Sequence, residues 1–439
     1  MDRLLALETF AGYNPALLGE IVRREIGRVR EAIGRGELEQ IDRNGLIEAI
    51  HQGYAEITTP SLRPLVNATG VIIHTNLGRS PIDPELFDKA RTIATKYCNL
   101  EYDLKRGRRG DRYLHTAGVL RDLLGAGDVL ILNNNAAAVF LILNTFAGGR
   151  EAIVSRGELV EIGGSFRIPD VITASGARLR EVGTTNKTRI SDYEAAIGEQ
   201  SAMLMKVHKS NYTIEGFSAE SDMQEISALA QRHGLIDYYD MGSAYLPDLP
   251  WGLGETEPSI LKLMEHPPAL LSFSGDKLFG GVQAGIIVGR KELVAKLKKN
   301  QLMRMFRVDK ITLSLLEQTA MAYRRRDYDR IPVLRMLSTG TEELERRAGA
   351  LRNRLDWPSD IKSSRSCVGG GTMPNRHIPT VILALEGEAV KLESHFRRYG
   401  VIGRIESERF ILDMRTVCEE DFDLIVAAAR EWRGGCDAG

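Results

Sequence analysis

Residues 128–146 read DVLILNNNAAAVFLILNTF, and this stretch decides the fold. Five residues of strand-forming character, 128–132, are followed by three asparagines and then by an apolar run that begins at Ala136. The pattern predicts a buried strand, a tight junction and a helix over 136–146, which together form half of a βα unit. Repeated units of this kind build a parallel sheet that helices cover on both faces.

The same alternation continues along the chain. Further short apolar segments predict strands at 151–155, 178–182, 202–207, 235–240 and 269–274. A helical pattern over 222–233 lies between two of them. We therefore predict an α/β fold with a mostly parallel central sheet in a large domain over residues 63–308. Ligands of such sheets bind beyond the carboxyl ends of the strands, so the residues that follow each strand are the candidate site.

The rest of the chain predicts two smaller parts. Helical periodicity over 17–33 and 41–57 predicts an N-terminal helical domain, residues 1–62. After residue 308, a long helix and an order of strand, helix, strand, helix predict a linking helix and a small C-terminal α/β domain, residues 309–439. Arginines flank the apolar stripe of the first helix among interleaved acids, so a solvated charged face and a nucleic-acid surface both remain open.

Composition narrows the class of protein. The 439 residues are 43% hydrophobic and 27% charged, which is typical of globular proteins and excludes a disordered or fibrous chain. The formal net charge of -1 excludes a uniformly basic nucleic-acid coat. Four scattered cysteines without CxxC spacing indicate neither disulfides nor a cysteine zinc site. Without a signal-peptide pattern at the start or an apolar run of membrane-spanning length, we expect a cytoplasmic protein.

The three asparagines Asn133, Asn134 and Asn135 lie where a strand passes into a helix. Free backbone N–H groups and the positive end of the helix dipole favour an anion at this place. Asparagine is equally one of the preferred N-cap residues. A phosphate cradle and a simple helix cap therefore both remain open.

Two later strand ends carry ionisable residues. Asp240 follows a strand and suits a protonated ring nitrogen or a metal, although Asp before Met-Gly is also a common turn residue. Lys277 lies in SGDKLFGG, residues 274–281, where an apolar strand enters a glycine-rich turn. A desolvated lysine has a lowered pKa and forms a Schiff base with an aldehyde, whereas most turn lysines are surface charges. Ser274 is a natural phosphate ligand.

An anion cradle, an aspartate and a lysine, in this order, are what pyridoxal phosphate needs for its phosphate, ring nitrogen and aldehyde. A P-loop is excluded because GxxxxGK[ST] is absent, and neither HExxH nor clustered His and Cys indicates a metal. Three arginines are candidate ligands of a phosphate-like dianion. They are Arg79 in HTNLGR, and Arg304 and Arg307, which lie three residues apart in the next predicted helical stretch and therefore share one helix face. Alternatively they are salt-bridge partners.

Several long strings resemble the bacterial selenocysteine synthase family, the L-seryl-tRNA(Sec) selenium transferases. They cover almost the whole chain and are NATG at 67–70, HTNLGR at 74–79, NNNAAAV at 133–139, SRGELVEIGGSFRIPDV at 155–171, EVGTTNKT at 181–188, KVHKSNYTIEGF at 206–217 and SFSGDKLFGG at 272–281. One departure is the MGSAY after Asp240, where the family reads closer to LGSG.

The resemblance implies a type I fold of pyridoxal-phosphate enzymes, with Lys277 as the Schiff-base lysine and Asp240 as the pyridine partner. It also implies that Arg79, Arg304 and Arg307 bind an anion in the active site, that the N-terminal domain holds tRNA, and that dimers assemble into a homodecamer. The implied reaction turns L-seryl-tRNA(Sec) into L-selenocysteinyl-tRNA(Sec) by loss of the serine hydroxyl and addition of selenium from selenophosphate. His208 and Asp276 are candidates for the general acid.

Two alternatives remain open. One is a pyridoxal-phosphate lyase that uses the same Lys277 on a small amino acid or an amino-sugar phosphate. A free amino acid needs an arginine for its carboxylate, and Arg404 or Arg415 could serve, whereas a serine ester has no such need. The other alternative is a tRNA-holding scaffold without catalysis.

Overall fold

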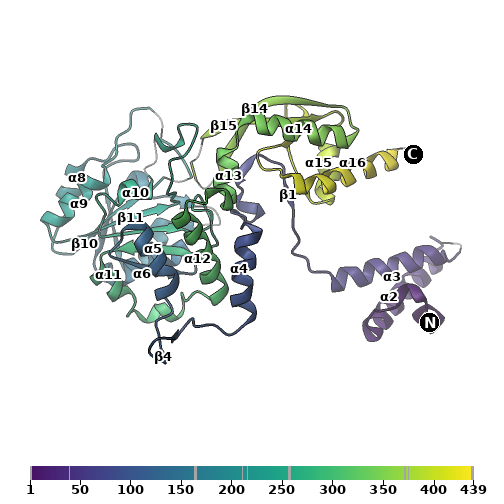
Figure 1. The fold of residues 1–439 in the computed structure, drawn as a ribbon, viewed down its shortest axis with the longest axis horizontal. Coiled ribbons are helices and arrows are strands. Elements are labelled where there is room, and N and C mark those ends of the chain that lie inside the picture. Colours follow the sequence, from purple (N-terminus) through teal and green to yellow (C-terminus); the bar gives the residue numbers. More distant parts are fainter. Residues whose placement is uncertain are drawn as a thin grey trace. The chain divides into compact units, whose positions relative to one another are not determined.

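A computed structural model of the chain describes residues 2–38, 40–162, 166–209, 211–214, 216–255, 259–369, 372–373 and 375–436. The chain forms two compact units, Met1–Leu65 and Val66–Gly439 (Figure 1). Within the described ranges, no helix has both the length and the apolar character that crossing a bilayer requires.

The first unit is helical. It contains α1 (Asp2–Leu5), the 3-10 turn η1 (Glu8–Phe10), α2 (Pro15–Gly34) and α3 (Arg43–Thr58). Asn14 and Asp42 cap the two long helices, as expected of side chains that accept from free backbone N–H groups. The apolar stripe of α2 packs with residues of α3 in a small core. The two predicted helices are confirmed.

A seven-stranded sheet forms the centre of the second unit, in the order β5-β13-β12-β11-β10-β6-β9. The strands are β5 (Asp128–Leu132), β6 (Glu151–Ser155), β9 (Arg178–Val182), β10 (Ser201–Val207), β11 (Ile236–Gly242), β12 (Leu270–Ser274) and β13 (Gly285–Gly289). All neighbours pair in parallel except at β13, which is antiparallel to both β12 and β5. The predicted mostly parallel α/β sheet is confirmed, and β13 is a strand that the sequence analysis missed.

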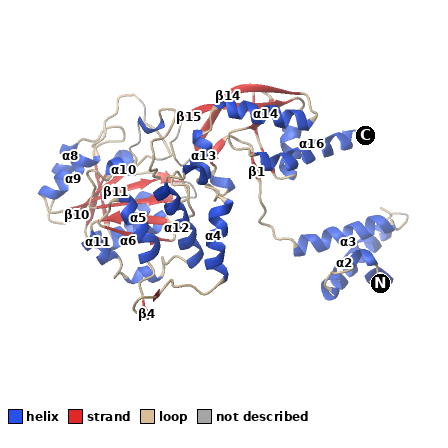
Figure 2. Ribbon diagram, viewed as in Figure 1, coloured by secondary structure: helices blue, strands red, loops and turns tan. Residues whose placement is uncertain are grey.

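Two apolar layers enclose this sheet because alternate strand residues face opposite sides. One layer packs against α5 (Leu114–Leu124), α9 (Met223–Arg232) and α12 (Lys310–Arg325), and the other against α6 (Asn135–Ala147), α7 (Ile168–Ala174) and α11 (Lys291–Leu297). Figure 2 shows the strands lying among these helices. Further helices of the large domain are α4 (Pro84–Thr95), α8 (Ile190–Ala196) and α10 (Ile260–Leu263).

A second sheet, in the order β17-β18-β15-β14-β2, forms the small lobe. Its strands are β2 (Val71–Ile73), β14 (Ser359–Gly369), β15 (His377–Leu385), β17 (Arg404–Glu406) and β18 (Arg409–Asp413). The helices of this part are α13 (Pro332–Ser338), α14 (Thr341–Leu355), α15 (Ala389–Arg398) and α16 (Phe422–Cys436). Residues 66–73 belong to this lobe, although the predicted large domain includes them, because β1 (Val66–Asn67) pairs with β16 (Val401–Ile402) and β2 pairs with β14.

Candidate active site

The carboxyl ends of β5, β10, β11 and β12 meet at one edge of the large sheet, because these strands point the same way. The residues at this edge are Asn133–Asn135 after β5, His208 after β10, Asp240 near the end of β11, and Ser274–Lys277 at the end of β12. The topology thus brings together most of the candidates that the sequence places at separate strand ends.

Asp240 is a buried acid at this edge, with 3% of its surface exposed. Its Oδ1 accepts hydrogen bonds from Asn135 Nδ2 at 2.8 Å and from the Gly242 N–H at 3.0 Å. Burial raises the pKa of Asp240, while these two bonds and the positive charge of Lys277 act in the opposite direction. The carboxylate is therefore held in place next to the lysine and can pair with a protonated ring nitrogen.

The three asparagines have different contacts. Asn134 caps α6, since its side chain accepts from the Ala137 N–H at 2.8 Å. Asn135 donates to Asp240, and its own Oδ1 is buried without a hydrogen-bond partner in the described structure. The backbone N–H of Asn133 donates to the carbonyl of Phe306 at 3.1 Å. The cap is therefore present at Asn134, while a phosphate role for the three residues stays a prediction.

Lys277 lies in the turn after β12 and is 8% exposed. Burial lowers its pKa, and the charge of Arg79 adds to that effect while Asp240 and Asp276 oppose it. The turn is tight, because a Cβ on Gly275 would lie 2.6 Å from the carbonyl oxygen of Val282. A buried lysine with a lowered pKa is suited to attack an aldehyde, since the neutral amine is the nucleophile.

Arg79 and Asp276 form an ion pair beside this lysine, with Arg79 Nη1 2.7 Å from Asp276 Oδ2. Asp276 is 6% exposed, and its second oxygen is buried without a hydrogen-bond partner among the described atoms. Arg79 has a φ of 65°, in the left-handed region. The structure therefore places one of the three predicted arginines at Lys277.

Arg304 and Arg307 lie elsewhere. They do not share a helix face, as the sequence spacing suggested, because the 3-10 turn η5 (Gln301–Arg304) ends at Arg304 and α12 begins only at Lys310. Both line a surface cavity of about 410 Å³ whose described lining includes neither Arg79 nor Lys277. Arg307 Nη1 lies 4.0 Å from Glu101 Oε1, at the limit of an ion pair.

The sequence analysis missed Arg112, which also lines this cavity. It is 9% exposed, and its Nε and Nη1 have no hydrogen-bond acceptor in the described structure. A carboxylate of Glu101 lies 3.7 Å from Nη1. Its burial depends on tertiary packing, so no local pattern distinguishes Arg112 from the neighbouring exposed arginines.

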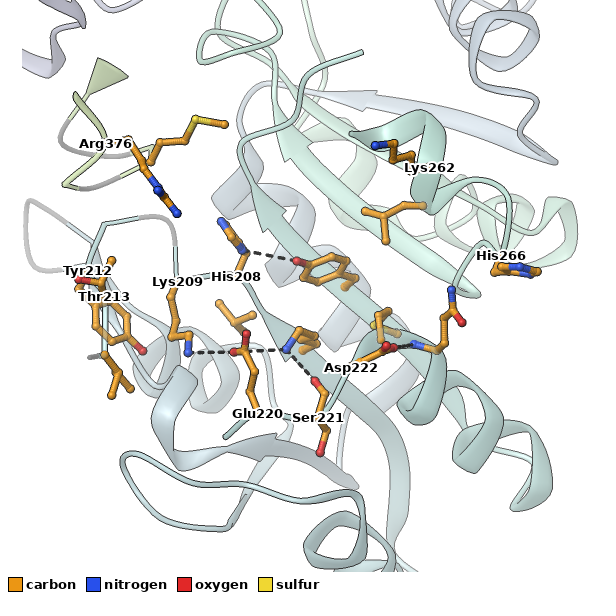
Figure 3. Close-up of a pocket in the computed structure, with 18 of the residues that line it drawn as sticks. His208, Lys209, Tyr212, Thr213, Glu220, Ser221, Asp222, Lys262, His266 and Arg376 are labelled. Carbon is orange, nitrogen blue, oxygen red and sulfur yellow. Dashed lines mark hydrogen bonds and ion pairs between the residues drawn. The ribbon is translucent and has the colours of Figure 1, made fainter. Parts of the chain in front are cut away.

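A larger cavity of about 820 Å³ lies at the carboxyl end of β10 (Figure 3). His208 lines it, and the His208 backbone N–H donates to the carbonyl of Asp240 at 2.8 Å. Lys209, Tyr212 and Arg376 also line this cavity. Lys209 and Tyr212 lie in the string KVHKSNYTIEGF, residues 206–217, but the sequence predicts no chemical role for any of the three residues. Ser210 and Glu215 of this string lie outside the described residues.

The chain is similar to several known proteins. Residues 65–418 match the family model described as L-seryl-tRNA selenium transferase. A relative from Nautilia profundicola named L-seryl-tRNA(Sec) selenium transferase is 57% identical over 93% of this chain and 91% of its own length. A relative of the same name from Aliarcobacter butzleri is 52% identical over 96% of this chain and 94% of its own length. A solved D-glucosaminate-6-phosphate ammonia-lyase has a TM-score of 0.61 and 19% identity, covering 85% of this chain and 98% of that one, and this likeness concerns the fold alone.

Proposed function

The chain belongs to the L-seryl-tRNA selenium transferase family, and we propose that it converts L-seryl-tRNA(Sec) into L-selenocysteinyl-tRNA(Sec) with pyridoxal 5′-phosphate as its cofactor. The observation that carries this conclusion is the 57% identity over 93% of the chain to a relative of that name. The reaction is the loss of the serine β-hydroxyl followed by the addition of selenium at the same carbon.

The residues at the sheet edge fit the cofactor. Lys277 offers an amine whose pKa burial lowers, and Asp240 offers a buried carboxylate that Asn135 orients. The asparagines lie at the start of α6, where free backbone N–H groups favour a phosphate. We propose Asn133, Asn134, Asn135 and Ser274 as phosphate ligands. When bound, pyridoxal phosphate supplies an aldehyde that links to amines and a ring that withdraws electrons from Cα.

The chain's own residues then move protons. Lys277 Nζ accepts the proton from Cα of the serine moiety, since its lowered pKa leaves the amine free to act as a base. Asp240 keeps a proton on the ring nitrogen through its charge. Departure of the hydroxyl needs an acid. Asp276 is engaged in its ion pair with Arg79, so we favour His208, which lines the large cavity and whose backbone N–H donates to the carbonyl of Asp240.

We propose that selenophosphate is the selenium donor and that Arg79, Arg304 and Arg307 hold its phosphate. Within one chain, Arg79 pairs with Asp276 beside Lys277, while Arg304 and Arg307 line the separate cavity of about 410 Å³. This separation supports a homo-oligomer in which the cavity of one subunit completes the site of its neighbour, as in a homodecamer built from dimers. The N-terminal helical unit is the proposed tRNA-binding part, and a charged tRNA as substrate implies the cytoplasm.

The lyase alternative loses support, because both arginines that could bind a free carboxylate are engaged. Arg404 donates to Asp413 and to the carbonyl of Thr69, each at 2.6 Å. Arg415 is 1% exposed and donates to the carbonyls of Met336 at 2.7 Å and Thr339 at 2.8 Å, and to that of Pro379. An ester substrate needs neither residue.

The test is a reaction of purified, cofactor-loaded protein with seryl-tRNA(Sec) and selenophosphate, read by the mass of the aminoacyl group. The expected product carries selenocysteine, and Lys277→Ala protein leaves the serine unchanged. The proposal is overturned if the active, cofactor-loaded protein leaves seryl-tRNA(Sec) unchanged but consumes free serine or an amino-sugar phosphate.

A further inference from the structure

Of the residues that line the cavity in Figure 3, His208 alone has a role in the proton transfers described above. Its volume of about 820 Å³ is within the usual range of small-ligand sites. Its walls come from the segment after β10, the start of α9, the end of α10, and residues Met373 and Arg376 of the small lobe. A cavity of this size, formed by both parts of the second unit, is suited to hold a portion of the substrate.

Hydrogen bonds connect this cavity with the turn that carries Lys277. The hydroxyl of Thr372 donates to Ser243 Oγ at 2.9 Å, and Ser243 Oγ also accepts from the backbone N–H of Leu278 at 3.4 Å. Leu278 directly follows the lysine. From Thr372 the chain reaches Arg376 in four residues, at most about 14 Å. The segment that carries Arg376 is therefore linked to the turn that carries Lys277, as a subsite for the nucleotide beside the aminoacyl group requires.

Two of the three acids among the described residues that line this cavity are already engaged. Glu220 is neutralised by Lys209 at 2.8 Å and by Lys206 at 3.7 Å. Asp222 is engaged in capping α9. Arg376 is exposed, and none of the described carboxylates lies within ion-pair distance of its guanidinium. Figure 3 shows this guanidinium pointing into the cavity toward His208.

Lys262, Glu265 and His266 at the rim also belong to the lining. Lys262 lies in α10 and Glu265 two residues beyond its end, so this part of the rim carries one charge of each sign. The excess positive charge of the cavity is therefore on the side of Arg376.

The backbone that carries Arg376 is held in an unusual conformation. Met373 and Asn375 have φ values of 50° and 61°, in the left-handed region that side chains other than glycine rarely adopt. Met373 is anchored in the core at 2% exposure, and Asn375 Nδ2 donates to Thr213 Oγ1 at 3.0 Å. Strain of this kind persists where the surroundings impose it and is frequent at ligand clamps.

We propose that this cavity binds the 3′-terminal nucleotide of the aminoacyl-tRNA, with Arg376 on the 5′ phosphate of that nucleotide. Guanidinium groups bind phosphate through paired, charge-assisted hydrogen bonds. Tyr212 forms a wall for the base, since its hydroxyl donates to the carbonyl of Gly157 and so holds the ring in place. The inference rests on the proposed function, because an RNA ester is what brings a nucleotide to Lys277.

The experiment uses two stable substrate analogues, serine linked by an amide to 3′-amino-adenosine, with and without a 5′ phosphate. Their affinities for the cofactor-loaded full chain are measured by calorimetry. We expect the phosphate to tighten binding by about 10- to 100-fold in the unmodified protein. Arg376→Ala loses this gain and Arg376→Lys keeps part of it. Arg352→Ala, which removes an exposed arginine of α14 outside the cavity lining, keeps all of it.

Each outcome decides the inference. If Arg376→Ala keeps the full phosphate gain, or if neither analogue binds to protein that converts seryl-tRNA(Sec), the nucleotide site is not in this cavity. If inorganic phosphate at matched concentration cancels the gain without the nucleoside, the cavity is a plain anion site and the inference is overturned. Failure of the unmodified protein to convert seryl-tRNA(Sec) instead contradicts the proposed function itself.

Discussion

Single residues at the sheet edge combine burial with charge. Lys277 and Asp240 are each less than a tenth exposed, and each has a pKa moved toward the neutral form by burial. The sequence predicts both as candidate site residues, because each lies at or shortly after the end of an apolar strand. The partner of Asp240 was not predictable, since Asn135 lies 105 residues away and reaches the carboxylate only through the order of strands in the sheet.

The pKa of Lys277 gives a prediction for cofactor-free protein. Because burial lowers it below the ordinary 10.5, the folded state binds the proton less tightly than the unfolded chain. Folding is therefore penalised at neutral pH, and the penalty disappears as the pH rises through the folded pKa to 10.5. Lys277→Met keeps the volume and removes the charge, so we expect a higher melting temperature than wild type at neutral pH and a difference that shrinks at alkaline pH.

The control is Lys262→Met, an exposed lysine whose replacement should shift the melting temperature little at either pH. A difference between Lys277→Met and wild type that grows as the pH rises would mean that the lysine is not desolvated.

Elements were predictable where the apolar pattern is strong and local. The bounds of β5, β6 and β9 agree with the predicted ranges, since each is a short segment with turn residues at both ends. β13 was missed because GIIVG, residues 285–289, is brief and has glycine at each end. The reason for a glycine at residue 285 becomes clear only in the folded sheet. β13 lies between β12 and β5, and Gly285 packs closely against the backbone of Asn134 and Asn135.

Gly285→Ala is the test of that junction. A Cβ at this position would overlap the carbonyl oxygen of Asn134 and lie 2.9 Å from the backbone nitrogen of Asn135. The displacement moves the residue that orients Asp240, so we expect cofactor affinity to fall by about tenfold or more. The measurement is a cofactor titration followed by absorbance. Gly118→Ala in α5, where a Cβ meets open space, should leave the affinity unchanged. Equal affinities for both variants would refute the role of the junction.

The small lobe depends on one buried carboxylate. Asp413 is 0% exposed and accepts from Thr380 Oγ1 at 2.6 Å, Ser366 Oγ at 2.9 Å and Arg404 Nη1 at 2.6 Å. Asp413→Ala removes the shared acceptor of Thr380, Ser366 and Arg404 and leaves the arginine, among the described carboxylates, only its pair with Glu406, so we expect a loss of about 3–5 kcal/mol in unfolding free energy, measured by urea denaturation. Asp360→Ala, at an exposed pair with Lys362 on β14, should cost less than about 1 kcal/mol. Similar losses for the two variants would contradict this account.

At the scale of the whole molecule, the separation of the arginines is the feature that the sequence could not predict. The sequence shows that Arg304 and Arg307 come after Lys277 in the chain, but it does not show which cavity they line. Domain boundaries have the same limit, because the parallel pairing of β2 with β14 joins segments about 300 residues apart. Non-local pairings of this kind leave no local periodicity to read.

Shared sites predict complementation between subunits. Lys277→Ala and Arg307→Ala proteins should each be inactive in selenium transfer. If one subunit's arginines serve its neighbour's lysine, co-expressed chains form mixed pairs with one intact site, and random mixing restores about a quarter of the wild-type activity. The assay is selenocysteine formation by purified mixed oligomers that carry two different tags. Mixed oligomers without activity would show that Arg307 does not act across subunits.

The account depends most on the bond between Lys277 and the cofactor, and trapping measures it directly. Cofactor-loaded protein is reduced with borohydride, digested and analysed by mass spectrometry. We predict one cofactor per chain, on the peptide that contains Lys277, and none on Lys277→Ala protein treated in the same way. A cofactor found on Lys206 or Lys209, or retained covalently by Lys277→Ala protein, would contradict the account.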